Sequence, residues 1–195
     1  MTVSPAIGGV LLAAGGGSRF TGAGQGHKLT ATLRGRPVVE WSLEQLLRAG
    51  FDDVVVVTGA VDLRVPDGVA TVHNPRWAEG QATSLAVAID RARQRELQAV
   101  VVGLADQPFV LAEAWQAVAE APEAIAVATY DGRRGNPVKL DASVWDLLPV
   151  EGDAGARVVI GMRPELVTEV ACAGSPADID TPEDLRRWNS PTTSP

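Results

Sequence analysis

The sequence predicts an α/β protein in which a mostly parallel sheet lies between two layers of helices. Strand-like and helix-like segments alternate along most of the 195 residues, which is the pattern of repeated β–α–β units. Segments 53–58 and 99–104 are continuously apolar, as expected for strands that are buried on both faces. Ligands of such sheets bind beyond the carboxyl ends of the strands, so the polar residues that follow each strand are the candidate functional residues.

Local signals define the expected elements. Helix 37–49 has proline in its first turn and Gly50 beyond its last turn. Strand 136–140 is expected to begin at Pro137 or to lie at an edge, because proline cannot donate to a β-ladder. Thr181 is the expected N-cap of the last helix. The expected strands are 7–13, 53–58, 69–73, 99–104, 125–130, 136–140 and 166–171, and the expected helices are 37–49, 82–93, 111–119, 142–148, 154–162 and 182–188.

Length and composition indicate one domain, 1–188, followed by a disordered tail, 189–195. The net charge of −7 argues against a nucleic-acid partner, because a phosphate backbone requires a basic surface. The single cysteine, Cys172, excludes an intramolecular disulfide and a metal site built from cysteines. The sequence shows neither a signal peptide nor an apolar run long enough to span a bilayer, so the cytoplasm is the expected location.

The segment 11–28, LLAAGGGSRFTGAGQGHK, has the composition of a phosphate-binding loop. Glycines after an apolar strand allow the backbone to approach a ligand, and their N–H groups can point at phosphate oxygens. Arg19 offers a planar fork to two oxygens, and Lys28 offers a mobile point charge. The spacing of the glycines does not match the dinucleotide fingerprint, and the P-loop's second glycine and hydroxyl residue are missing. A flexible surface loop is the alternative interpretation.

Carboxylates follow two other predicted strands. Asp106 comes directly after strand 99–104, where a carboxylate is costly unless it is paired or binds a cation. Asp178 and Asp180 follow strand 166–171 and lie two residues apart, so in an extended segment they point the same way. Mg²⁺ prefers one or two carboxylates together with substrate phosphates. We therefore expect a metal site at Asp106 and Asp180, with Asp178 as the alternative second ligand and helix capping as the alternative role of these residues.

Three further loops carry candidate binding residues. Gly80 and Ser84 lie where a helix begins, which favours an anionic ligand group, although an ordinary capped helix is equally consistent with them. Arg133 and Asn136 lie in a glycine-containing segment that suits a phosphate of a second substrate, or else a solvated hairpin turn. We assign Arg133, Asn136 and Asp153 to the acceptor substrate, with a helix N-cap as the alternative role of Asp153.

Seven motifs in order give the chain a resemblance to the MobA-like nucleotidyltransferase family, and most of all to its molybdenum cofactor cytidylyltransferase branch. Leu12, Ala14, Gly15, Arg19 and Lys28 stand where the family signature places them. LAAG, in place of LAGG, and NPxWxxGxxxSL are similar to the cytidylyl branch. Two departures are the extra glycines Gly22, Gly24 and Gly26, and His27 before the lysine. The motifs are LLAAGGGSR with Lys28-Leu29, GRP at 35–37, NPRWAEGQATSL, ADQP, GRRGNPV, EGDAGAR and DIDTPEDL.

The resemblance implies a Rossmann-like three-layer fold of the nucleotide-diphospho-sugar transferase type. It also implies transfer of CMP from CTP to the terminal phosphate of molybdenum-loaded molybdopterin, with release of pyrophosphate. In this interpretation Mg²⁺ lies on Asp106 and Asp180, and Arg19, Lys28 and Asp106 are the catalytic residues. A general base is unnecessary, because a phosphate monoester is already ionised at neutral pH. The expected nucleotide-binding residues are Leu12, Ala13, Ala14, Gly15, Gly16, Gly17, Arg19, Lys28, Gly80 and Ser84.

Three alternatives remain open. One is a related nucleotidyltransferase that uses GTP or another acceptor, such as a sugar phosphate or phospholactate. The second is a nicotinamide-dependent oxidoreductase, although Thr58-Gly59 stands where such an enzyme has an acidic residue after its second strand. The third is a non-catalytic protein that carries the cofactor to a molybdenum hydroxylase.

Overall fold

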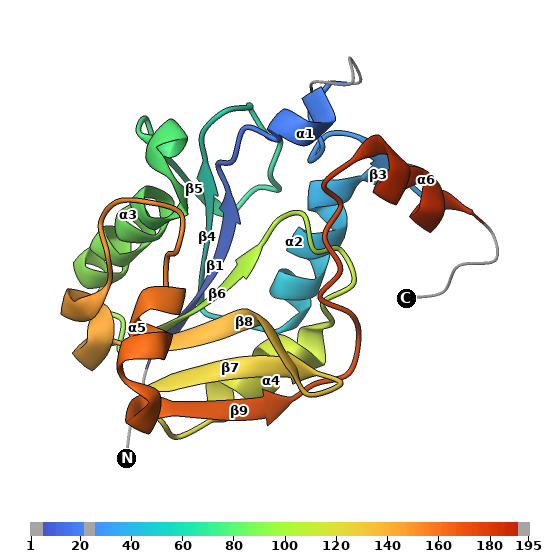
Figure 1. Ribbon diagram of the computed structural model, residues 1–195. Coiled ribbons are helices and arrows are strands. Elements are labelled where there is room, and N and C mark those ends of the chain that lie inside the picture. The colour runs from blue at the N-terminus through green and yellow to red at the C-terminus, as the bar shows by residue number, and fades with distance from the viewer. Residues whose placement is uncertain (1–5, 22–25, 191–195) are drawn as a thin grey trace.

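The computed structural model describes residues 6–21 and 26–190. A seven-stranded sheet forms its middle layer, in the order β5-β4-β1-β6-β8-β7-β9 (Figure 1). Strand β8 runs antiparallel to both of its neighbours, and the other neighbouring pairs are parallel. The strands are β1 (Ile7–Ala13), β4 (Asp53–Thr58), β5 (Ala70–His73), β6 (Ala99–Leu104), β7 (Ile125–Tyr130), β8 (Arg133–Asp141) and β9 (Val167–Ala171).

Helices cover both faces of the sheet, because its central strands are apolar on both sides. Along β1, Val10 and Leu12 pack in the core that includes α3 (Gln81–Gln94) and α5 (Arg157–Met162). Leu11 and Ala13 pack in the opposite core, with α2 (Val38–Arg48) and α4 (Ala112–Glu120). The Rossmann-like three-layer fold that the sequence predicts is therefore confirmed.

A third, smaller core lies at the carboxyl edge of the parallel strands. It joins α1 (Ser18–Thr21), the hairpin of β2 (Thr32–Leu33) and β3 (Arg36–Pro37), and α6 (Pro182–Asn189). Figure 1 shows α1 and α6 above the same end of the sheet. This packing brings the loop after β1 and the last segment of the chain to the same place. Its buried residues are Phe20, Leu33, Val38, Phe109, Ile179 and Trp188.

The prediction for Pro137 is wrong. Strand β8 begins four residues earlier and lies inside the sheet, between β6 and β7. Its ladder tolerates the proline because pairing with β6 reaches only to Val138, and pairing with β7 shifts register between Val127 and Thr129. The proline therefore occupies the irregular part of the strand, where a missing N–H group removes no ladder bond.

The predicted tail begins too early. Asn189 is the last residue of α6, and its side chain holds the β2–β3 hairpin. Arg34 N donates to Asn189 Oδ1 at 2.6 Å, and Asn189 Nδ2 donates to Thr32 O at 3.1 Å. Residues 191–195 lie outside the described residues. Thr181 caps α6 as predicted, in a capping box with Asp184.

Several other boundaries differ in detail. Segment 142–148 is the 3₁₀ helix η2 (Ala142–Leu147), and segment 154–162 is helical only from Arg157. The short elements α1, β2, β3 and the 3₁₀ helices η1 (Trp77–Glu79) and η3 (Pro164–Leu166) were not predicted, since two to four residues carry no periodicity. Within residues 6–21 and 26–190, no helix is long and apolar enough to cross a membrane.

We expect Gly103→Ala to destabilise the fold by about 1–3 kcal/mol, the usual cost of overpacking a core. Gly103 lies in β6 under the buried ring of Trp115, and a Cβ atom there would overlap that ring. Urea unfolding measures the change.

The matched control is Gly161→Ala in α5, where a Cβ atom meets nothing within 4 Å. That change should be neutral or stabilising, because alanine favours a helix by about 0.5–1 kcal/mol over glycine. Equal stability of Gly103→Ala and the wild type would contradict this account of the core.

Candidate active site

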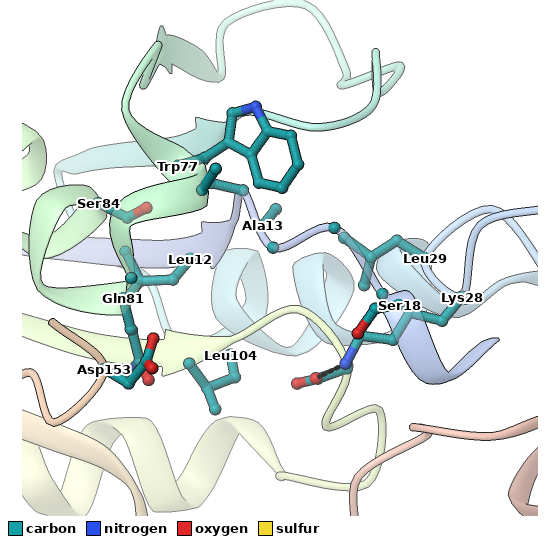
Figure 2. Close-up of a pocket in the computed structure, with 17 residues that line it drawn as sticks. Leu12, Ala13, Ser18, Lys28, Leu29, Trp77, Gln81, Ser84, Leu104 and Asp153 are labelled. Carbon is teal, nitrogen blue, oxygen red and sulfur yellow. Dashed lines mark hydrogen bonds and ion pairs between the residues drawn. The ribbon is translucent and has the colours of Figure 1, made fainter. Parts of the chain in front are cut away.

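A cavity of about 420 Å³ opens at the carboxyl edge of the sheet. The end of β1, the loop that follows it, η1 and the start of α3 form its walls, together with the end of β6 and the loop before α5 (Figure 2). Residues from five separate stretches of the chain therefore meet in one site. The lining residues are Leu12 to Ser18, Lys28, Leu29, Trp77, Ala78, Gly80, Gln81, Ser84, Leu104, Asp106 and Asp153.

The ammonium of Lys28 joins two carboxylates at one end of this cavity. Its Nζ donates to Asp106 Oδ2 at 2.5 Å and to Asp180 Oδ1 at 2.6 Å. Arg19 Nη1 donates to the other oxygen of Asp180 at 2.7 Å. The Lys28 side chain is 13% exposed, whereas Arg19 is 72% exposed. All four residues that the sequence predicts as catalytic or metal-binding are thus joined in one cluster.

The electrostatics of this cluster favour its charged forms. Burial alone acts to lower the pKa of Lys28, but the charges and hydrogen bonds of Asp106 and Asp180 outweigh it and raise that pKa. Burial acts to raise the pKa of Asp180, and the hydrogen bonds and charges of Lys28 and Arg19 outweigh it and lower that pKa. Both shifts favour the charged forms of Lys28 and Asp180.

Asp106 has an unused ligand atom. Its Oδ1 is buried and has no hydrogen-bond partner among the described residues. The alternative role as a helix cap is not realised, because the next helix, α4, begins only at Ala112. In the described part of the chain, no three His, Cys, Asp or Glu side chains gather as metal ligands. The arrangement instead suits a cation that shares few carboxylates with substrate oxygens, as Mg²⁺ does.

The segment that carries Asp180 is fastened to the end of β6. Ile179 N donates to Asp106 O at 2.9 Å. Gln107 Nε2 donates to Asp178 Oδ1 at 2.8 Å, and Gln107 Oε1 accepts from Asn136 Nδ2 at 3.1 Å. Burial, then the charge of Asp106, raise the pKa of Asp178. Because Gln107 engages Asp178, Asp180 is the carboxylate that faces Asp106 across Lys28.

The glycine loop is held by His27, one of the two departures from the family pattern. Leu29 N donates to His27 Nδ1 at 3.2 Å, so the ring proton lies on Nε2, which is 2.9 Å from Gly15 O. Burial lowers the pKa of His27, which keeps the ring neutral. The hydrogen bond from His27 Nε2 to Gly15 O fastens the glycine loop to the residue that precedes Lys28. Gly22 and Gly24, part of the other departure, lie outside the described residues.

The opposite wall of the cavity is closed by the loop before α5. Gly80 has a φ of +111°, and a Cβ atom there would lie 2.5 Å from the backbone of Gly152. Ala82 N donates to Gly152 O at 2.9 Å. Asp153 does not cap a helix, because the N-cap of α5 is Ala156. Asp153 instead lines the cavity.

Most predicted nucleotide-binding residues line this one cavity, whereas the predicted acceptor residues separate. Asp153 lines the cavity, but Arg133 and Asn136 lie outside its lining. Arg133 is exposed at the start of β8, and its neighbour Arg134 pairs with Glu169 on β9. Asn136 instead donates to Gln107, whose side chain also binds Asp178. Sequence reasoning did not single out Trp77 and Gln81, whose only signal is their place between β5 and α3.

A glycine loop and a lysine–carboxylate cluster, at the carboxyl edge of a mostly parallel sheet, define the class of nucleotide-binding α/β proteins. The chain belongs to the MobA-like NTP transferase domain family, whose model matches residues 9–169. It is therefore a member of a nucleotidyltransferase family.

Known relatives cover nearly the whole chain. "Nicotine blue oxidoreductase" of Paenarthrobacter nicotinovorans is 34% identical, over 94% of this chain and 96% of the relative. "Purine catabolism protein PucB" of Bacillus subtilis (strain 168) is 31% identical, over 93% and 95%. The crystal structure of Rv0371c from Mycobacterium tuberculosis H37Rv matches with a TM-score of 0.81 at 30% identity, over 96% of this chain and 98% of that one. A structure of Rv0371c in complex with manganese matches with a TM-score of 0.74 at 29% identity, over 93% and 97%.

We expect Lys28→Met to destabilise the protein by about 1–3 kcal/mol, because it leaves two mostly buried carboxylates without a counter-charge. The double variant Lys28→Met/Asp180→Asn should lose less stability than the sum of the two single changes. Urea unfolding of all four proteins, in EDTA, measures the coupling. Additive losses would show that the ammonium does not hold these carboxylates together.

The lowered pKa of Asp180 also predicts a pH dependence. A carboxylate with a lowered pKa stabilises the fold above its ordinary pKa, and this contribution is lost as the pH falls through the lowered value. The stability difference between the wild type and Asp180→Asn should therefore be largest near about pH 6 and shrink toward about pH 3. A difference that grows with acidity would contradict the assigned ion pairs. Urea unfolding across this range, in EDTA, measures it.

Proposed function

We propose that the protein transfers CMP from CTP to the terminal phosphate of molybdenum-loaded molybdopterin and releases pyrophosphate. The observation that carries this proposal is the Lys28 ammonium, fixed by Asp106 and Asp180 beside the glycine loop in a cavity that opens at the strand ends. The resemblance of LAAG and NPxWxxGxxxSL to the cytidylyl branch supports CTP as the nucleotide. A soluble reaction of this kind is expected in the cytoplasm.

A divalent cation, Mg²⁺ in the cell, belongs to this proposal. The buried and unpartnered Oδ1 of Asp106, with Asp180 facing it across Lys28, fits such an ion. The manganese complex of Rv0371c, a protein 29% identical to this chain, supports the same assignment. When bound, the cation offsets negative charge on the two reacting phosphates.

The residues of the chain supply binding and charge. In the proposed complex Lys28 and the exposed Arg19 turn from their carboxylate partners to the β and γ phosphates and stabilise the leaving pyrophosphate. The backbone of Gly15 to Gly17 lies along the triphosphate, and the bond from His27 to Gly15 O keeps that loop in place. Since the acceptor phosphate is already ionised, these residues act by positioning and electrostatics, as in other phosphoryl transfers.

The acceptor is proposed to enter beside Asn136 and Arg133. Asn136 is bonded to Gln107, the residue next to Asp106, so an acceptor that contacts Asn136 lies close to the metal site. Its terminal phosphate would then approach the α-phosphorus from the β8 side of the cavity. The proposal includes a molybdenum hydroxylase as the partner that receives the product.

A second candidate is hydride transfer with a nicotinamide cofactor, since one relative at 34% identity is named an oxidoreductase. The geometry of the site favours hydride transfer less than nucleotidyl transfer. Gly59 follows β4 in place of an acidic ribose ligand, and a Cβ atom there would lie 2.7 Å from both Ala14 O and Trp77 Cβ.

We expect Asp106→Asn to lower nucleotidyl transfer by at least about 100-fold, as loss of a metal ligand or of transition-state charge stabilisation does. The assay follows label from α-labelled CTP into molybdopterin, with Mg²⁺ present, and follows oxidation of NADH and NADPH in parallel. The stability of the variant should change little, because Lys28 keeps Asp180 as its partner.

The matched control is Asp67→Asn, an exposed carboxylate in the turn before β5, which should transfer at the wild-type rate. Wild-type transfer by Asp106→Asn would remove Asp106 from the site. Oxidation of a nicotinamide cofactor without any transfer from CTP would favour the second candidate function.

A further inference from the structure

The cavity has two ends of opposite character. Lys28 and Asp106 form one end, and Figure 2 shows Asp153 beside Gln81 at the other, with Leu12 and Leu104 between them. If the proposed function holds, the triphosphate lies against Lys28 and the glycine loop. The nucleobase then extends toward Gln81 and Asp153, because Lys28 is the one cation among the described residues that line the cavity and it lies at the other end.

Asp153 is presented to the cavity by a fixed loop. Gly152 N donates to Glu79 O at 3.3 Å, and Gly152 O accepts from Ala82 N at 2.9 Å. The Asp153 Oδ1 lies so near Gly80 that a Cβ atom on that glycine would come within 2.8 Å of it. Among the described residues, no group donates a hydrogen bond to this carboxylate. Its acceptor atoms therefore remain open to a ligand.

The chemistry of an ionised carboxylate makes this end selective. Such a group only accepts hydrogen bonds, so it pairs with an amino group and is repelled by a carbonyl oxygen. Cytosine carries an amino group where uracil, which has the same shape, carries a carbonyl oxygen. The amide of Gln81, which lines the cavity, has both a donor and an acceptor for the rest of the base edge.

Trp77 provides the apolar surface of the same compartment. Its ring lies over Gly16, where a Cβ atom would come within 2.8 Å of it, and it lines the cavity opposite Leu104 (Figure 2). Aromatic rings of this kind bind the faces of bases or sugars without distinguishing among them. Selection between bases therefore falls to the polar groups of Gln81 and Asp153.

From this geometry we infer that Asp153 is a specificity-determining residue, which selects a nucleotide with an amino-bearing base over its carbonyl-bearing counterpart. The inference rests on the proposed function, namely on an NTP in this cavity. It assigns Asp153 to the nucleotide and not to the acceptor, with which the sequence had grouped it.

The test measures binding of CTP and UTP, with Mg²⁺ present, by isothermal titration calorimetry. We expect the wild type to bind CTP at least about tenfold more tightly than UTP, as for one well-formed hydrogen bond to a charged group. Asp153→Asn replaces a pure acceptor by a group that also donates, so the ratio of the two affinities should fall toward one.

The control is Glu151→Gln, a neighbouring exposed carboxylate of the same loop that pairs with Arg76 and lines no part of the cavity in the described structure. It should keep the wild-type ratio. Equal affinities in the wild type, or an unchanged ratio in Asp153→Asn, would overturn the role of Asp153 while leaving nucleotide binding intact. Binding of neither nucleotide would overturn the inference and the proposed function together.

Discussion

The ammonium of Lys28 satisfies two carboxylates that reach it from distant parts of the chain. Asp106 lies at the end of a central strand, and Asp180 lies just before the last helix. Without the lysine, these two mostly buried carboxylates would repel each other. The third core packs α1 against the segment that leads into α6. This packing holds Lys28, Asp106 and Asp180 within contact distance.

The same constraint explains the polarity of the cavity. Lys28 lies where the glycine loop meets β6, and the loop before α5 places the carboxylate of Asp153 at the other end. The walls between these ends are apolar, with Leu12, Leu104 and Trp77. A ligand that is anionic at one end and able to donate hydrogen bonds at the other fits this distribution, and a nucleotide with an amino-bearing base has both properties.

Unbroken apolar runs were sufficient to predict the central strands, because strands such as β6 are buried on both faces of the sheet. The rule that ligands bind at the carboxyl ends of strands led to Lys28, Asp106 and Asp180. Contacts that depend on tertiary packing could not be predicted from the sequence. Nothing local shows that β8 runs between β6 and β7, so Pro137 was misplaced.

The same limit applies to the site. The composition of residues 151–157 permits a helix cap, an acceptor site or a nucleotide site. Asp153 lines the cavity because Ala82 N donates to Gly152 O and holds this loop against the start of α3, a contact that the sequence does not show. His27 was interpreted as a departure from a family pattern, but its Nε2 binds Gly15 O of the glycine loop and its Nδ1 accepts from Leu29 N. Such roles depend on neighbours that are close in space and remote in sequence.

The separation of 152 residues between Lys28 and Asp180 has a consequence for how the protein is made. Domains form as the chain leaves the ribosome, beginning with its amino-terminal part. A nascent chain that has completed β1, β4 and β6 already holds Lys28 and Asp106, but it lacks the second carboxylate and the helix that anchors it. The site can therefore close only after Asp180 has been synthesised, and a chain truncated before Asp180 would present the glycine loop without the second carboxylate that binds its lysine.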